Sequence, residues 1–151
     1  RGYLRSEVYK QFKKLAKAAK AEGYSIRAMS NYRSYNEQSG LYNGYVNANG
    51  QTSADRYSAR PGHSEHQSGL CFDVTGGNGS MFNYHNDASY KWMLANCHKY
   101  GFIQRYRKGK AALTGYEFES WQFRYVGIGP AATIYEQNWI LEEYLFMIYG
   151  V

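Results

Sequence analysis

The stretch from Leu70 to Val74 is the feature that most narrows the folds open to this chain. Its apolar residues Leu70, Phe72 and Val74 alternate with Cys71 and Asp73, which is the two-residue periodicity of a β-strand. Asp73 is therefore expected on the strand face opposite Leu70 and Phe72. A carboxylate inside an apolar strand costs free energy unless it is paired or binds a metal. The fold must bring such a partner to Asp73.

Helical and strand patterns alternate around this stretch. Apolar residues at helical spacing predict a helix with Ser6 as its N-cap and Gly23 just past its end. Ser34 and Glu37 have the spacing of a capping box, so a second helix should begin at Tyr35. The other expected elements are strands at 24–30, 102–106 and 118–126, a long loop at 47–66, a helix at 89–100 and a last helix from near 138. This order indicates a single α+β domain over residues 1–151, with a central antiparallel sheet flanked by helices.

The charge balance favours anionic partners. The 151 residues include 18 basic and 12 acidic side chains, for a net charge of +6. Such a surface suits nucleic acid, acidic lipids or cell-wall polymers, and simple solubility explains it as well. Because the basic residues are scattered and no known nucleic-acid motif is present, nucleic acid is not an expected partner. No apolar run approaches the ~18 residues of a membrane span, and no signal peptide is recognisable.

The two cysteines, Cys71 and Cys97, do not have the short spacing of a metal-binding pair. Two interpretations are open. They are free, buried thiols, which is the favoured one, or they close a disulfide loop.

Residues 64–73, S-E-H-Q-S-G-L-C-F-D, combine a histidine with the strand carboxylate. His66 and Asp73 offer the nitrogen and oxygen donors that zinc accepts at roughly 2.0–2.2 Å. The alternative is structural: His66 is a polar loop residue, and Asp73 caps a turn or pairs with an arginine. The remaining histidines are most simply structural; they are His63, His85 and His98.

The segment E-S-W-Q at 119–122 adds a candidate general base. Glu119 could activate water if it lies in a partly apolar pocket against Trp121. Positions three apart in a regular strand face opposite sides. For Glu119 and Gln122 to serve one site, Glu119 must precede the strand or lie at a bulge. Otherwise Glu119 is an ordinary solvated carboxylate.

Several stretches resemble the VanY-type D-alanyl-D-alanine carboxypeptidases and their L,D-carboxypeptidase relatives, which are zinc peptidases that trim peptidoglycan stem peptides. The resemblance covers most of the chain and keeps the order and spacing of separate motifs. The matching stretches are YRSYNEQ (32–38), SARPGHSEHQSGLCFDV (58–74), ANCHKYGFIQRY (95–106), TGYEFESWQFRYVG (114–127) and LEEY (141–144).

The resemblance implies a role for each matching position. His66 and Asp73 would be the first two zinc ligands, position 122 the third, and Glu119 the catalytic base. Arg33 would hold the carboxyl end of the substrate or stabilise the oxyanion. Residues expected to line the substrate groove are Gln38, Ser64 and Trp121.

The sequence departs from the family pattern at two positions. Cys71 stands where the family usually has a small residue, which is a mild change. Gln122 stands where the family has histidine, and an amide oxygen suits hard cations such as calcium better than zinc. Zinc binding should therefore be weakened. Three explanations stay open: a deliberate replacement that inactivates the enzyme, a natural pseudoenzyme, or weak coordination with residual activity. The first is favoured because the other catalytic positions are intact.

The resemblance implies a zinc-dependent carboxypeptidase that removes the C-terminal D-alanine from stem peptides, with D,D- or L,D-specificity. The alternative is a peptidoglycan-peptide-binding module of the same fold that does not cleave its ligand. The resemblance also implies a monomeric domain on the extracellular or cell-wall face of a bacterial envelope. We expect it to be trimmed from a longer secreted or membrane-anchored protein.

Overall fold

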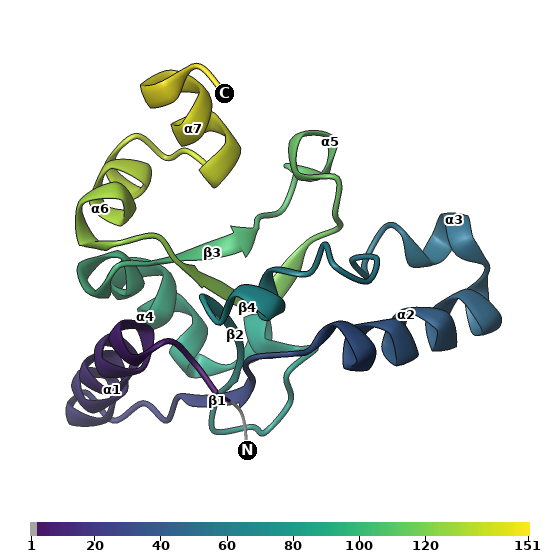
Figure 1. Ribbon diagram of the computed structural model, residues 1–151. Helices are drawn as coiled ribbons and strands as arrows, with labels where there is room; N and C mark the ends of the chain where they lie inside the picture. The colour runs from purple at the N-terminus through teal and green to yellow at the C-terminus, as the bar shows by residue number, and fades with distance from the viewer. Residues whose placement is uncertain (1–2) are drawn as a thin grey trace.

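A four-stranded antiparallel sheet forms the centre of the molecule (Figure 1). The computed structural model describes residues 3–151. Its strands are β1 (Arg27–Ser30), β2 (Cys71–Thr75), β3 (Phe102–Tyr106) and β4 (Glu119–Tyr125), in the order β1-β2-β4-β3. The helices are α1 (Ser6–Ala21), α2 (Tyr35–Asn49), α3 (Gln51–Ala54), α4 (Ala88–Asn96), α5 (Ala111–Thr114), α6 (Ile128–Glu136) and α7 (Leu141–Tyr149). Short 3₁₀ turns are η1 (Glu65–Ser68), η2 (Tyr84–Asn86) and η3 (Cys97–Tyr100). The predicted α+β class with a central antiparallel sheet is confirmed.

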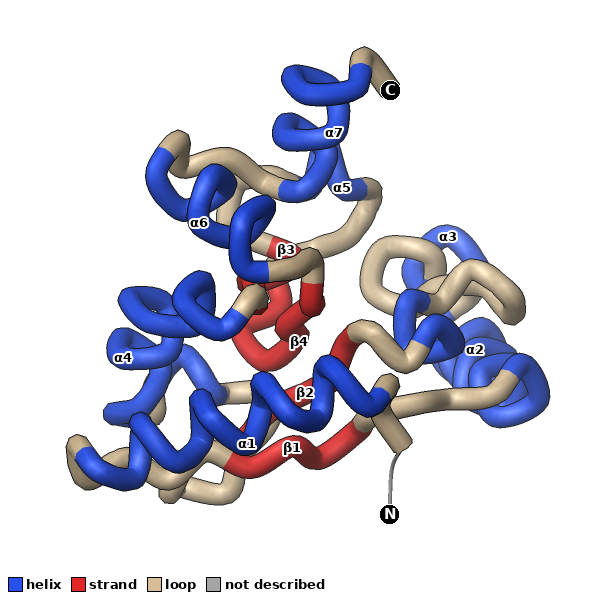
Figure 2. The backbone as a smooth tube through the Cα atoms, turned by 60° about the vertical axis from the view of Figure 1, so that its left-hand side comes forward, coloured by secondary structure: helices blue, strands red, loops and turns tan. Residues whose placement is uncertain are grey.

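The main core lies between one face of the sheet and the helices α1 and α4 (Figure 2). Phe72 and Val74 of β2 are fully buried there, against Leu15 of α1 and Met93 of α4. Asp73 has the opposite side-chain direction and lines a cleft outside this core. The predicted separation of Asp73 from the apolar face of its strand is therefore correct.

The capping box begins α2 as predicted. Ser34 is the N-cap, its hydroxyl accepts from the Glu37 amide, and the Glu37 carboxylate accepts from the Ser34 amide. This cap fixes where α2 leaves the end of β1. The segment before it therefore has a defined path past the sheet, which matters because Arg33 belongs to that segment.

Several predicted boundaries are wrong. Residues 47–66 are not one loop, since α2 continues to Asn49 and α3 and η1 follow. The 89–100 helix is α4 followed by the tighter turn η3. The first helix has Arg5 rather than Ser6 as its N-cap. The last helix begins at Leu141 rather than near 138.

Helix α6 was not predicted, because its first residues, I-G-P, are typical of a turn. Pro130 is its third residue, within the first helical turn, where the missing amide hydrogen is not needed for a helical hydrogen bond. By contrast, Gly101 stops η3 as predicted. It has φ +85°, and a Cβ there would lie 2.5 Å from the Tyr125 ring. No helix within residues 3–151 has the length and apolar character to cross a membrane.

Candidate active site

A cleft of about 530 Å³ lies on the Asp73 face of the sheet. The strands β2 and β4, the turn η1 and the helix α2 contribute to its walls. All eight residues singled out in the sequence line this cleft: Arg33, Gln38, Ser64, His66, Asp73, Glu119, Trp121 and Gln122. A second cavity, of about 550 Å³, lies between α4, β3 and α6 and contains none of them. Among the described residues, carboxylates line the first cavity and are missing from the lining of the second.

His66 and Asp73 face each other inside the cleft. His66 Nδ1 lies 2.6 Å from the Asn31 carbonyl oxygen, which can only accept, so Nδ1 carries the proton. In the neutral ring Nε2 is then an acceptor, and it lies 3.5 Å from Asp73 Oδ1. Within the described residues, Oδ1 is buried without a hydrogen-bond donor. Two acceptors at this distance leave a place for a proton or a metal cation.

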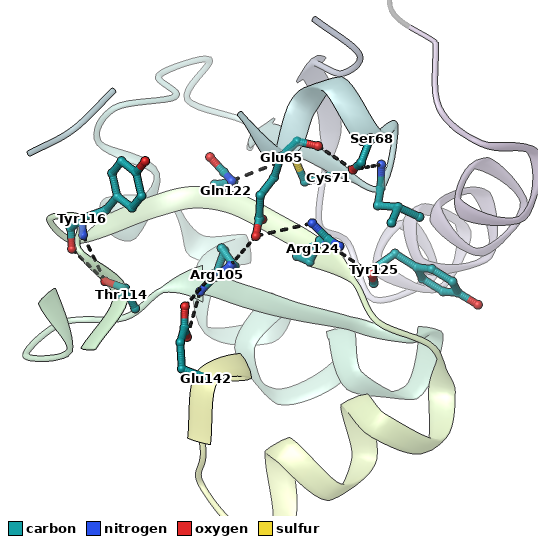
Figure 3. Close-up of polar contacts among 11 residues, drawn as sticks. Glu65, Ser68, Cys71, Arg105, Thr114, Tyr116, Gln122, Arg124, Tyr125 and Glu142 are labelled. Atoms are coloured by element: carbon teal, nitrogen blue, oxygen red, sulfur yellow. Dashed lines mark hydrogen bonds and ion pairs between the residues drawn. The ribbon is translucent and has the colours of Figure 1, made fainter. Parts of the chain in front are cut away.

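Strand pairing brings position 122 to the same place. Asp73 and Gln122 are directly opposite each other on the antiparallel strands β2 and β4, and their side chains share one face of the sheet. Gln122 donates from Nε2 toward Cys71 Sγ at 3.9 Å, a weak contact (Figure 3). The amide oxygen is therefore the only donor atom that Gln122 can offer a cation.

A bulge in β4 brings Glu119 to the face occupied by Gln122. Gln104 of β3 pairs with Phe123, whereas Tyr106, two residues later, pairs with Glu119, four residues earlier. This register shift interrupts the regular alternation of side chains, and Glu119 and Gln122 both line the cleft. The sequence requires such an irregularity if Glu119 and Gln122 are to serve one site, and the structure contains it.

Glu119 is buried, with 7% of its surface exposed, which rules out an ordinary solvated carboxylate. The pKa of Glu119 is raised to about 8, chiefly by burial and then by the negative charge of Asp73, while the Arg33 cation opposes both. A carboxyl group with a pKa near neutrality can both take up and release a proton at working pH. The predicted pocket for Glu119 is therefore present.

Arg33 forms the cationic wall of the cleft. Its guanidinium donates to Gln38 Oε1 at 2.8 Å and to Ser30 Oγ at 3.0 Å, and it lies 3.9 Å from Asp73 Oδ2. Gln38 is held in turn by donating to the Ala59 carbonyl at 2.6 Å. An arginine partner for Asp73, one of the structural alternatives for this residue, is therefore present. Arg33 approaches Asp73 Oδ2, whereas His66 faces Oδ1. Gln38 orients Arg33 as well as lining the groove.

The aromatic wall of the cleft contains Trp121, as expected from the sequence, and also Phe82, Tyr106 and Tyr116, which the sequence did not indicate. Phe82 packs edge-on against Trp121 with ring centroids 5.3 Å apart, and Tyr106 lies 5.0 Å from Tyr116. The sequence has 17 tyrosines, and those within residues 32–57 are expected to line the groove; Tyr45 and Tyr57 do so. Among residues 3–151, no three His, Cys, Asp or Glu side chains cluster as a metal site. This follows from the glutamine at position 122.

Comparison with known families agrees with this geometry. Residues 1–128 match the family model of VanY, D-alanyl-D-alanine carboxypeptidase. The chain belongs to the VanY family. The resemblance noted in the sequence is thereby confirmed, and the single domain shares its fold with solved VanY-family structures.

Individual members of the VanY family are similar over nearly the whole chain. A D-alanyl-D-alanine carboxypeptidase of Enterococcus faecium is 37% identical over 144 residues, 95% of this chain and 44% of that protein. The LdcB LD-carboxypeptidase structure is 41% identical with a TM-score of 0.89, covering 94% of this chain and 68% of that one. A VanY D,D-pentapeptidase mutant solved in complex with Zn(II) is 35% identical, with a TM-score of 0.83 and coverages of 94% and 83%. The chain spans about half the length of the curated VanY relatives it matches.

Proposed function

We propose that this domain is a zinc-dependent carboxypeptidase that removes the terminal D-alanine from peptidoglycan stem peptides. The observation that carries the proposal is the meeting of His66, Asp73 and Glu119 with Arg33 in one cleft. The activities of the VanY relatives support the substrate class. This assignment extends to a monomeric domain, part of a longer protein, that acts at the outer face of a bacterial envelope.

Two of the three expected donors fit zinc. Tetrahedral bonds of about 2.0–2.2 Å place two donor atoms about 3.3–3.6 Å apart. The distance of 3.5 Å between His66 Nε2 and Asp73 Oδ1 falls in that range. The hydrogen bond from His66 Nδ1 to Asn31 fixes the ring as the outer partners of zinc-binding histidines do. Gln122 fits less well, because its amide oxygen is a weaker donor to zinc than an imidazole nitrogen.

The chain supplies a base and a positive charge to the reaction. When bound, zinc acts as a Lewis acid that polarises the scissile carbonyl. Glu119 accepts a proton from the attacking water and returns it to the leaving amine of D-alanine. Arg33, held by Gln38 and Ser30, faces negative charge on the substrate carboxylate or in the transition state. Trp121 and Phe82 line one side of the cleft, packed edge-on against each other.

Gln122 favours a second candidate function, a module that binds the stem peptide without cleaving it. The cation Arg33 and the aromatic wall need no metal to hold a peptide carboxylate. The weakened third donor affects the metal but leaves the rest of the cleft intact. Binding and cleavage are therefore separable in this chain.

The test compares the unchanged protein with the Gln122→His variant. Each is incubated with zinc and with purified pentapeptide and tetrapeptide muropeptides. Mass spectrometry measures the loss of one alanine, and calorimetry measures peptide binding. Gln122→His combined with Glu119→Gln is the control, because it keeps the metal donors and removes the base. Release of alanine by Gln122→His, but not by the control, supports the carboxypeptidase. Tight peptide binding by all three proteins without release supports the binding module.

A further inference from the structure

A partly buried ion-pair network connects α7 to the turn that carries His66 (Figure 3). Its centre is Arg105 of β3, which is 8% exposed. Arg105 Nε donates to Glu65 Oε1 at 2.9 Å, and its two terminal nitrogens donate to the Glu142 carboxylate at 3.0 and 2.6 Å. Arg124 Nη1 lies 3.4 Å from the same Glu65 oxygen. The guanidinium is thus clamped between the site and α7.

Glu65 transmits this contact to the site because it directly precedes His66 in η1. This turn is four residues long, and the Ser68 hydroxyl donates to the Glu65 carbonyl within it at 2.6 Å. The Gln67 amide donates to the Ser64 carbonyl at 3.1 Å, and the Gly69 amide donates to the His66 carbonyl at 3.3 Å. A four-residue turn has little stability of its own. Its geometry therefore depends on side-chain contacts such as those of Glu65.

Helix α7 has no fully buried residue, and several of its apolar side chains, including Phe146 and Met147, are exposed. Leu141 and Tyr144 pack against the small core under α6. Two ion pairs add to this packing, Arg105–Glu142 and Lys110–Glu143. Only the first leads to the cleft. Helix α7 lies beyond residues 1–128, which match the family model, although LEEY (141–144) is one of the stretches that resemble the family.

The bidentate contact decides where the Arg105 side chain lies. Paired N–H···O bonds between a guanidinium and a carboxylate fix both the position and the plane of the group. Removing the carboxylate leaves two buried NH₂ groups without an ionic partner, which costs more than an exposed pair would. Turning toward water would then lower the desolvation cost of the Arg105 guanidinium. Its hydrogen bond to Glu65 would weaken as a result.

We propose that Glu142 is a positioning residue of the active site, which acts through Arg105 and Glu65 to hold the turn containing His66. The proposal concerns the geometry of η1 in the protein as it stands. It uses the proposed function only for the importance of His66.

The test is hydrogen exchange of the Gln67 and Gly69 amides, measured by NMR in the unchanged protein and in its variants. Glu142→Gln keeps the shape of the side chain and removes its charge. Exchange of both amides should rise about tenfold, which corresponds to about 1.4 kcal/mol of coupling. The matched control is Lys110→Gln, which breaks the other ion pair of α7 but leaves the Ile140 amide free to donate to the Glu143 carboxylate. It should change the exchange of these amides less than about twofold.

A second comparison separates positioning from general loss of stability. In a Glu65→Gln background, Glu142→Gln should add little further exchange, because the connection is already broken. Should Glu142→Gln fail to fold, Arg105→Lys, which keeps the charge but loses the fork, should raise exchange in the same direction. Equal exchange in Glu142→Gln and Lys110→Gln, or full additivity with Glu65→Gln, would overturn the proposal. Neither readout needs zinc or peptide, so this result is independent of the enzymatic assignment.

Discussion

His66 Nε2 and Asp73 Oδ1 lie 3.5 Å apart in the cleft, and both atoms are acceptors when the ring is neutral. The second ring nitrogen is engaged by the Asn31 carbonyl, so the ring cannot turn to relieve the contact without losing a 2.6 Å hydrogen bond. The pair therefore leaves a place for a proton or a metal cation between the two atoms. Position 122 decides how strongly that cation is held.

Gln122→His should raise the zinc affinity of the protein at least about tenfold, because an imidazole nitrogen replaces an amide oxygen beside Asp73. Competition with a chromophoric chelator measures the affinity. Gln104→His is the matched control, since Gln104 is also a buried glutamine of this sheet but lines the other cavity. Equal zinc affinity of Gln122→His and the unchanged protein would contradict the prediction.

Glu119→Gln should alter how stability depends on pH in the metal-free protein. An unfolded glutamate has a pKa of about 4.3, whereas burial raises the pKa of Glu119 to about 8. Between these values the folded state binds the extra proton, so stability is highest below the unfolded pKa and falls until pH passes the folded pKa. Over this pH range, the free energy of unfolding should fall by about 2–4 kcal/mol less in the variant than in the unchanged protein.

Urea unfolding at about pH 5 and at about pH 8 measures that difference. Glu117→Gln is the control, because Glu117 is exposed and lies two residues before Glu119. Parallel pH profiles for Glu119→Gln and the unchanged protein would show that Glu119 titrates normally.

Arg33→Met should weaken binding of peptides with a free C-terminal carboxylate by about 10- to 100-fold, since a partly buried, charge-assisted contact is lost. The same peptide with an amidated C-terminus should bind both proteins alike. Arg60→Met controls for the general loss of positive charge, because Arg60 pairs with Asp55 away from Asp73. Calorimetry measures both affinities. An equal loss of affinity for the carboxylate and the amide peptide would rule out carboxylate binding by Arg33.

The cysteines should be unreactive in the native protein. Cys71 and Cys97 are free and buried, which favours the thiol interpretation over a disulfide. Burial raises the pKa of Cys97 to about 12 and that of Cys71 well above its usual range. Since the thiolate is the reactive form, a thiol reagent should label two groups per chain only after unfolding. Rapid native labelling, or an intact mass two hydrogens lighter, would contradict this.

Local sequence signals predicted the elements that carry the site. Ser34 and Glu37 determine the start of α2 through contacts three residues apart. The alternation around Asp73 correctly assigns its side chain to the face away from the core. Helix α6 was not predicted, because Pro130 is compatible with a helix only in its first turn. The sequence does not show where that first turn begins.

By itself, the sequence determined which residues could do chemistry and which face of its strand Asp73 occupies, because these properties depend on neighbours a few positions away. Only the tertiary structure decided that Glu119 shares a face with Gln122, through a bulge set by the pairing of β3 with β4. It also decided that Arg105 connects Glu65 to Glu142, residues 77 positions apart in the sequence. Contacts of this range arise from packing, which no local periodicity encodes.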